Sequence, residues 1–208
     1  MATRNPGKVR ELAELLRDLE VRLLSLADFP ELPEIPEEGE TFAANAAAKA
    51  LAVARLTGLP ALADDSGLEV DALGGWPGVH SARYARDRTH PAAPTDDDNW
   101  RKLLEEMREV PEGRRQARFV CEIALAWPDG RLWRARGECP GVIARQPRGS
   151  GGFGYDPVFF LPEMGVTMAE VGLELKNRLS HRAKALAALR ELLAARRGEW
   201  EGESAAPA

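Results

Sequence analysis

Two adjacent aspartates, Asp64 and Asp65, offer the clearest chemistry in the sequence, between the apolar residues 61–63 and the pair Ser66 and Gly67. We expect the apolar run to end a buried strand, and the residues from Asp64 to Gly67 to form the turn that terminates it. Successive side chains of a strand point to opposite faces, so the two aspartates have different roles. Two acids at a strand end commonly hold a hard divalent cation. An Asx-type turn without chemistry fits the same residues.

Only five of the 28 basic residues are lysines. A position that keeps lysine in such an arginine-rich chain is a candidate for a site that needs a compact ammonium. Lys8 follows Asn5 and Pro6, residues typical of the N-cap and the first position of a helix. A cation in the first turn opposes the helix dipole, so an anion bound at this N-terminus would explain Lys8. A capped surface helix with an arbitrary lysine is the alternative.

A second lysine, Lys49, falls in an alanine-rich helix predicted over residues 41–56, with Thr41 as its N-cap and Gly58 after its end. Asn45 and Lys49 are four residues apart, so they share one face of this helix. They are its main polar side chains. A solvated helix edge is the simpler interpretation of the pair.

Four glycines within residues 149–154 predict a backbone that can wrap around a ligand. The aromatic rings of Phe153 and Tyr155 can stack on a planar base. Asp156 can accept a hydrogen bond from a sugar, a base or the protein itself. A flexible surface loop has the same composition, so this signal is weak by itself.

The last polar motif begins an amphipathic helix near the C-terminus. Ser180 is the predicted N-cap, and Leu186 and Leu189 mark the apolar stripe of the helix. His181 and Arg182 occupy its first turn, where positive charge is again disfavoured by the dipole. Two predicted helices therefore carry cations at the unfavourable end.

The other predicted elements frame these motifs. They are a weak strand at 21–26, a solvated acidic loop at 29–39, a mobile loop from 86, a helix at 100–109, a strand at 117–127, a hairpin turn at 128–130, its return strand at 132–136 and a strand at 158–161. We interpret the three aspartates at 96–98 as a solvated helix cap rather than a metal site.

The bulk properties exclude several classes of protein. The 208 residues fit one α/β domain or two lobes around a cleft. A net charge of −5 does not favour a nucleic-acid or membrane surface. The two cysteines, Cys121 and Cys139, lack metal-type spacing, and we expect them to be reduced and buried or half-buried. We see no signal peptide or membrane-spanning run and therefore expect a cytoplasmic protein.

Several motifs occur together in one order and resemble those of the inosine triphosphate pyrophosphatase family, the non-canonical purine nucleotide (XTP/dITP) pyrophosphatases. They are Thr3-x-Asn5-x-x-Lys8, Glu37-Glu38-Gly39-x-Thr41-Phe42, Asn45-Ala46-x-x-Lys49-Ala50, Ala63-Asp64-Asp65-Ser66-Gly67, Gly74-Gly75-x-Pro77-Gly78, Ser81-Ala82-Arg83-Tyr84, Gly151-Gly152-Phe153-Gly154-Tyr155-Asp156-Pro157, and Lys176 followed by Ser180-His181-Arg182. Each motif is weak alone, and their combination is specific.

The resemblance implies an α/β fold with an elongated mixed sheet, flanking helices and two lobes around a central cleft. It implies a single domain over residues 1–195, and we expect residues 196–208 to form a disordered tail. The implied activity is Mg²⁺-dependent cleavage of ITP, dITP and XTP between the α- and β-phosphates. The products are pyrophosphate and a nucleoside monophosphate. The family is typically dimeric, so a homodimer is expected.

The resemblance also assigns roles by position. Asp65 is implied as general base and metal ligand, with Glu37 as the second metal carboxylate and Ser66 as a substrate contact. The remaining substrate-binding positions are Thr3, Arg4, Asn5, Pro6, Gly7, Lys8 and Lys49 for the phosphates, Phe153, Gly154, Tyr155 and Asp156 for the base pocket, and Lys176, His181 and Arg182 for recognition of the base. Because arginine only donates hydrogen bonds, Arg182 directed at purine position 6 would favour an oxo group over an amino group.

The sequence departs from the family pattern in two places, and three rival functions conflict with its motifs or its net charge. The family usually has a longer first strand before Thr3, and it often has glutamate where this chain has Ala44, the capping-box position. A Maf-like nucleotide pyrophosphatase of other specificity conflicts with the motifs at 153–156 and 180–182. A nucleotide-binding protein without catalysis conflicts with the presence of Glu37 and Asp65. An RNA-binding module conflicts with the acidic net charge.

Overall fold

The computed structural model describes residues 1–3, 8–9, 12–13, 22–33, 35–86, 93–196 and 198. Its helices are α2 (Phe42–Thr57), α3 (Asp96–Glu106), α4 (Leu173–Leu179) and α5 (His181–Ala195), and its strands are β1 (Ala61–Val70), β2 (Gln116–Ala126), β3 (Leu132–Ile143), β4 (Phe159–Leu161) and β5 (Val166–Thr167). Short 3-10 helices are η1 (Leu26–Asp28), η2 (Asp71–Leu73), η3 (Gly78–Arg83), η4 (Glu112–Arg114), η5 (Asp156–Val158) and η6 (Met168–Glu170). Over these ranges, no helix has both the length and the apolar composition that crossing a bilayer requires.

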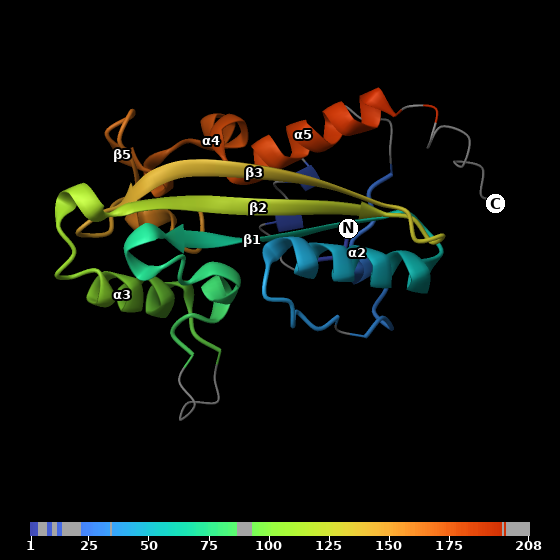
Figure 1. Ribbon diagram of the computed structural model, residues 1–208, viewed down its shortest axis with the longest axis horizontal. Coiled ribbons are helices and arrows are strands. Elements are labelled where there is room, and N and C mark those ends of the chain that lie inside the picture. Colours follow the sequence, from blue (N-terminus) through green and yellow to red (C-terminus); the bar gives the residue numbers. More distant parts are fainter. Residues whose placement is uncertain are drawn as a thin grey trace.

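The five strands lie in chain order in one sheet, and the neighbouring pairs are antiparallel throughout the described residues. The long strands β1, β2 and β3 run along an elongated molecule (Figure 1). β1 is an edge strand of this sheet, and Ala2 donates its N–H to the carbonyl of Leu62 at 2.8 Å. The expected α/β fold with an elongated sheet and flanking helices is therefore confirmed, but the described strand pairs are all antiparallel, whereas a mixed sheet was expected.

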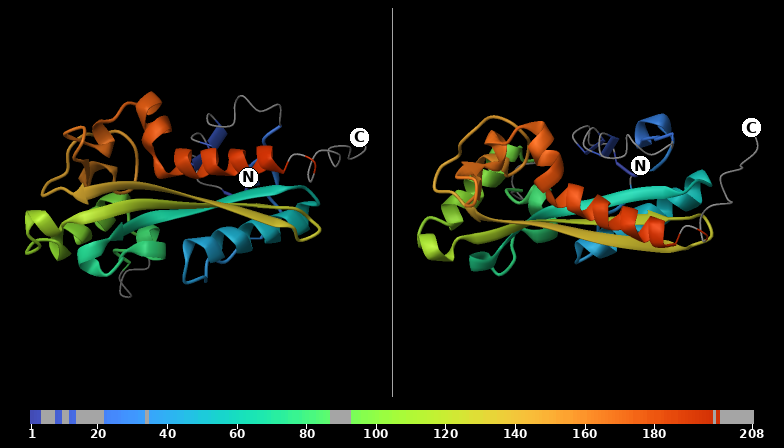
Figure 2. Two further views of the ribbon diagram at one scale, coloured as in Figure 1. Left: turned by 45° about the horizontal axis from the view of Figure 1, so that its top comes forward. Right: turned by 90° about the horizontal axis from the view of Figure 1, so that it is seen from above.

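The two faces of the sheet carry different helices, because side chains alternate along each strand. On one face, Ala124 and Ala126 of β2 pack against the alanine-rich side of α2. On the other face, Cys121 and Ile123 pack against Leu186 of α5. Figure 2 shows α2 and α5 on either side of the strands. This alternation decides which helix each side chain of β1 meets.

A third apolar cluster fills the other end of the molecule. It joins Leu68 and Val70 at the end of β1 to Leu103 of α3, Phe159 of β4 and Met168 of η6. The core is thus divided between two ends of the sheet, and residues from both ends line the cavity described below. This arrangement agrees with two lobes around a cleft.

Local signals in the sequence predicted several elements correctly. The side chain of Thr41 caps α2 by accepting a hydrogen bond from the Ala44 N–H, and Gly58 ends the helix. Ser180 caps α5, and the hairpin joins β2 to β3 as expected. Both cysteines are free and buried.

Three predicted boundaries are wrong, in addition to the end of the return strand predicted at 132–136, which continues to Ile143 because β2 pairs with it as far as Val142. Asp64 and Asp65 do not form a turn, because β2 pairs with β1 continuously from Ala61 to Val70. The predicted strand at 21–26 is absent from the described part of that segment, since Ser25 and Asp28 form a capping box that starts η1.

The third correction concerns α3, which begins four residues before the predicted helix. Thr95 and Asp98 form a capping box, and three acids in the first turn complement the helix dipole. The expected mobile loop falls partly on residues 87–92, and most of the expected tail falls on residues 197 and 199–208, all outside the described residues.

Candidate active site

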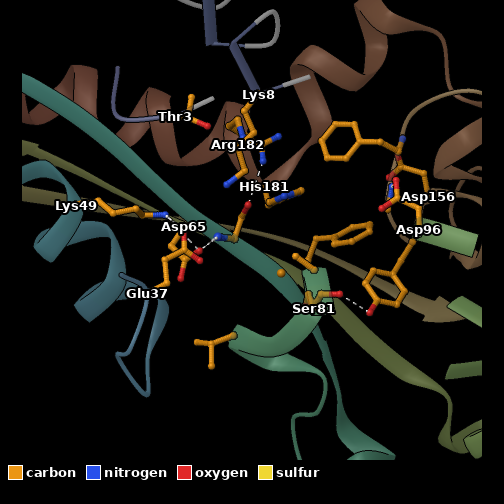
Figure 3. A pocket seen from close by; sticks show the side chains of 18 of the residues that line it. Thr3, Lys8, Glu37, Lys49, Asp65, Ser81, Asp96, Asp156, His181 and Arg182 are labelled. Atoms are coloured by element: carbon orange, nitrogen blue, oxygen red, sulfur yellow. Dashed lines mark hydrogen bonds and ion pairs between the residues drawn. The ribbon is translucent and has the colours of Figure 1, made fainter. Parts of the chain in front are cut away.

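All predicted site residues that the structure describes line one cavity of about 370 Å³. They are Thr3, Lys8, Glu37, Lys49, Asp65, Ser66, Phe153, Gly154, Tyr155, Asp156, Lys176, His181 and Arg182. The predicted residues Arg4, Asn5, Pro6 and Gly7 lie outside the described residues. Figure 3 shows Lys49 beside Asp65 and Glu37 at one end of the cavity, Asp156 at the other end, and Arg182 between them.

The first end of the cavity holds two carboxylates that share one ammonium group. Lys49 Nζ lies 2.8 Å from Glu37 Oε1 and 3.7 Å from Asp65 Oδ1, and it donates to the Asp64 carbonyl at 2.8 Å. Burial lowers the pKa of Lys49, but Asp65 and Glu37 outweigh burial and raise it, so the ammonium stays charged. Burial raises the pKa of Asp65, and Lys49 only partly offsets this rise. Asn45 and Lys49 are 2% and 7% exposed, so the helix face that they share is buried and is not a solvated edge.

Asp64 points to the opposite face of β1 and binds cations from distant parts of the chain. Its Oδ2 lies 2.9 Å from Lys8 Nζ and 3.3 Å from Arg182 Nε. Arg182 also donates to the Ser66 hydroxyl at 3.0 Å and is 1% exposed. Burial would raise the pKa of Asp64, but Lys8 and Arg182 outweigh burial and hold it well below its usual range. The Asp64 carboxylate thus balances the charges of Lys8 and Arg182, and it is a partner that neither interpretation of Lys8 included.

His181 is not a cation in this environment, which corrects the prediction of positive charge at this position. Its ring stacks on Phe119 with centroids 5.0 Å apart, and its buried Nδ1 has no hydrogen-bond partner among the described residues. Burial and the neighbouring Arg182 lower the pKa of His181 well below its ordinary value. His181 therefore presents a neutral imidazole to the cavity.

The glycine-rich segment forms the second end of the cavity around a buried ion pair. Asp156 Oδ2 lies 2.7 Å from Lys176 Nζ and accepts the Phe153 N–H at 2.9 Å. Lys176 Nζ also lies 4.8 Å from the centroid of the Phe153 ring. A Cβ at Gly152 would stand 1.9 Å from Asp156 Oδ2, and Gly152 has a φ of +76°. Only glycine fits that position, so this end has a defined shape rather than that of an arbitrary flexible loop.

Two contacts that the sequence did not indicate hold the glycine-rich segment in place. Asp96 accepts the Gly154 N–H at 2.7 Å, so this first-turn aspartate of α3 is more than a helix cap. The Tyr155 hydroxyl donates to the Ser81 carbonyl at 2.8 Å. These partners are 58 and 74 residues apart in sequence, and no local pattern indicates such pairings.

The donor set at the first end fits a hard divalent cation. Carboxylate oxygens are the ligands that Mg²⁺ prefers, and Mg²⁺ usually takes one or two of them together with water and substrate phosphates. Glu37 and Asp65 supply that number. Throughout the described residues, no group of three or more His, Cys, Asp or Glu side chains could form a cage made by the protein alone. The arrangement therefore suits a metal that arrives with a phosphate-bearing ligand.

The chain is similar to named proteins over nearly its whole length. A profile of the Ham1 family matches residues 1–192. A dITP/XTP pyrophosphatase of Geobacter sulfurreducens is 53% identical over 202 residues, covering 97% of this chain and 96% of that protein. A dITP/XTP pyrophosphatase of Thermus thermophilus is 56% identical over 191 residues, covering 92% and 89%. The solved structure of a HAM1 protein from Coxiella burnetii superposes with a TM-score of 0.83 at 42% identity, covering 93% and 96%.

Proposed function

Because the chain belongs to the Ham1 family, we propose that it hydrolyses the purine nucleoside triphosphates ITP, dITP and XTP to a monophosphate and pyrophosphate. The observation that carries this proposal is the cavity itself. It places two carboxylates suited to a metal at one end and an aromatic ring over a buried ion pair at the other. Relatives named dITP/XTP pyrophosphatase match along almost the full chain and favour this function over a Maf-like one.

In the proposed reaction, Glu37 and Asp65 hold Mg²⁺, which supplies positive charge against the triphosphate when bound. The oxygen of a water molecule bonds to the α-phosphorus, and the bond from this phosphorus to the bridging oxygen of the β-phosphate breaks. Asp65 accepts the proton of the attacking water, a role for which a carboxylate with a raised pKa is suited. Lys8, Lys49 and Thr3 bind the phosphate oxygens and stabilise the charge that develops there.

Recognition of the base is assigned to the second end of the cavity. The base stacks on Phe153, near which Lys176 and Arg182 are held in fixed positions. Arg182 has only donors, so it satisfies the oxo group at position 6 of hypoxanthine or xanthine. The amino group of adenine would be a donor facing a donor, at a cost of about 1–3 kcal/mol.

The remaining predicted properties belong to the same proposal. The protein forms a homodimer, as its family resemblance implies, and acts in the cytoplasm, where nucleoside triphosphates are used. A molar mass measured by light scattering tests the dimer, since the monomer has a mass of 22.7 kDa.

The function is tested by pyrophosphate release from dITP, XTP, dGTP and dATP, with Mg²⁺ or with EDTA. We expect Mg²⁺-dependent release from dITP and XTP and little from dGTP or dATP. Glu37→Gln should raise the Mg²⁺ concentration that half-maximal pyrophosphate release requires. The neighbouring exposed Glu38, which does not line the cavity, gives the matched control Glu38→Gln. No release from any substrate would contradict the function, and equal release from dATP and dITP would contradict the assigned specificity.

A further inference from the structure

We propose that Asn45 is a positioning residue that fixes the two metal carboxylates relative to each other. The inference rests on the proposed function, because that function assigns Mg²⁺ to Glu37 and Asp65. Asn45 lies on α2, one turn before Lys49, and is 2% exposed. A buried amide of this kind normally has all its hydrogen bonds satisfied by specific partners.

The amide of Asn45 joins the two segments that carry the carboxylates. Its Nδ2 donates to Asp65 Oδ2 on β1 at 2.9 Å. Its Oδ1 accepts the N–H of Gly39 at 2.8 Å, and Gly39 follows Glu37 by two residues in the same loop. The orientation of the amide is fixed by these partners, because a backbone N–H only donates and an ionised carboxylate only accepts.

The contact with the loop is close enough to exclude other side chains from position 39. A Cβ added to Gly39 would lie 2.7 Å from Asn45 Oδ1 and 3.0 Å from the Cβ of Ala44. The loop that carries Glu37 therefore packs directly against the first turns of α2. The Asn45 amide therefore links the position of this loop to the position of Asp65.

Lys49 cannot supply the same constraint. Its ammonium attracts both Glu37 and Asp65, but it is a point charge on a flexible stem and does not fix their orientation. The planar amide holds its donating Nδ2 and its accepting Oδ1 in fixed directions, so it sets both the distance between Asp65 and the Gly39 loop and the rotamer of Asp65. Loss of such a hydrogen bond to a ligating carboxylate typically weakens metal affinity or activity about 10–100-fold.

The test compares Asn45→Ala with Asn99→Ala in two assays. Asn99 is also 2% exposed and also joins two segments, accepting the Ala85 N–H at 2.8 Å and donating to the Ala82 carbonyl at 3.3 Å. The first assay measures the Mg²⁺ concentration for half-maximal hydrolysis of dITP. The second measures Mn²⁺ binding by electron paramagnetic resonance, with a non-hydrolysable dITP analogue present.

For Asn45→Ala we expect the half-saturating Mg²⁺ concentration to rise, and the Mn²⁺ affinity to fall, by about 10–100-fold. Asn99→Ala should change neither value. Unchanged metal affinity in Asn45→Ala, or an equal loss in Asn99→Ala, would overturn the proposal. If Asn45→Ala does not fold, Gly39→Ala replaces it, because the added methyl group displaces the loop from the amide and should weaken the metal in the same way.

The Mn²⁺ assay separates this inference from the proposed function, because it needs no turnover. Wild-type protein that binds Mn²⁺ but releases no pyrophosphate from dITP would contradict the function, while the Asn45 comparison could still be made. Active wild-type protein with normal metal affinity in Asn45→Ala would contradict only the positioning role.

Discussion

We expect the buried imidazole of His181 to make the free energy of unfolding depend on pH. The folded protein holds His181 neutral, because burial and Arg182 lower its pKa well below 6.5. In the unfolded chain the same side chain titrates near its ordinary value of about 6.5. Below that pH the unfolded state binds one proton that the folded state does not. The contribution of the neutral His181 to the free energy of unfolding is therefore fully present above about pH 6.5 and decreases as the pH falls below it.

The magnitude follows from the difference of one bound proton. The free energy of unfolding changes by up to about 1.4 kcal/mol per pH unit below pH 6.5. Between pH 7.5 and pH 5.0 the loss from His181 alone is up to about 2 kcal/mol. Asp65 acts in the opposite direction, since its raised pKa lets the folded state bind a proton more readily as the pH falls. The comparison of variants must therefore isolate the histidine.

The assay is urea unfolding at pH 7.5, 6.5, 5.5 and 5.0 for the parent protein, His181→Gln and His80→Gln. His80 is only partly buried, where it stacks on Trp76, so its replacement serves as the control. We expect the parent and His80→Gln to lose stability in parallel below pH 6.5, and His181→Gln to lose about 2 kcal/mol less over the range. An equal pH dependence in the parent and His181→Gln would refute the assignment of a neutral imidazole.

Four further predictions concern single residues. Asp65→Asn should abolish pyrophosphate release while dITP still binds, and turnover near the wild-type rate would remove Asp65 from the mechanism. Arg182→Ala should lower the ratio of kcat/KM for dITP over dATP by about 10–100-fold, and an unchanged ratio would mean that the base is read elsewhere. Ala44→Glu supplies the glutamate of a capping box at the start of α2 and should raise the free energy of unfolding by about 1 kcal/mol or less, measured in urea. Gly152→Ala should raise the KM for dITP, because its Cβ would collide with Asp156, and a normal KM would contradict the rigid second end of the cavity.

Local chemistry in the sequence predicted the elements whose ends depend on one or two residues. Thr41 and Gly58 determine both ends of α2, and Ser180 determines the start of α5. The turn between β2 and β3 follows from the residues at 128–130. In each case the hydrogen bonds at the end of the element involve neighbours in sequence, so they are visible without the fold.

The charge states of the site could not be predicted, because they depend on partners far apart in sequence. Arg182 and Asp64 are 118 residues apart, and their contact converts an apparently unfavourable cation into a neutralised pair. His181 loses its charge through burial, which a sequence pattern at a helix start does not show. The continuation of β1 through Asp64 likewise depends on β2, which supplies a paired residue at every position.

The strand β1 explains why the two adjacent acids differ in their chemistry. Alternation directs Asp65 to the α2 face, where Asn45 and Lys49 meet it, and directs Asp64 to the α5 face, where Arg182 meets it. A slip of one residue in the register with β2 would exchange the two carboxylates. Because the surrounding groups set each pKa, the exchange would place Asp65 beside Lys8 and Arg182 and would move Asp64 to the α2 face, beside Lys49.

Ser81 opposes such a slip and also links β1 to the second end of the cavity. Its hydroxyl accepts the Leu68 N–H at 2.9 Å and donates to the Gly78 carbonyl at 2.6 Å, while its own carbonyl accepts the hydroxyl of Tyr155 at 2.8 Å. One side chain and one carbonyl group thus connect the carboxylate-bearing strand with the glycine-rich segment. Under the proposed function, this connection helps to hold the phosphate and base sites at a fixed separation, so a substrate must match a spacing that exists before it binds.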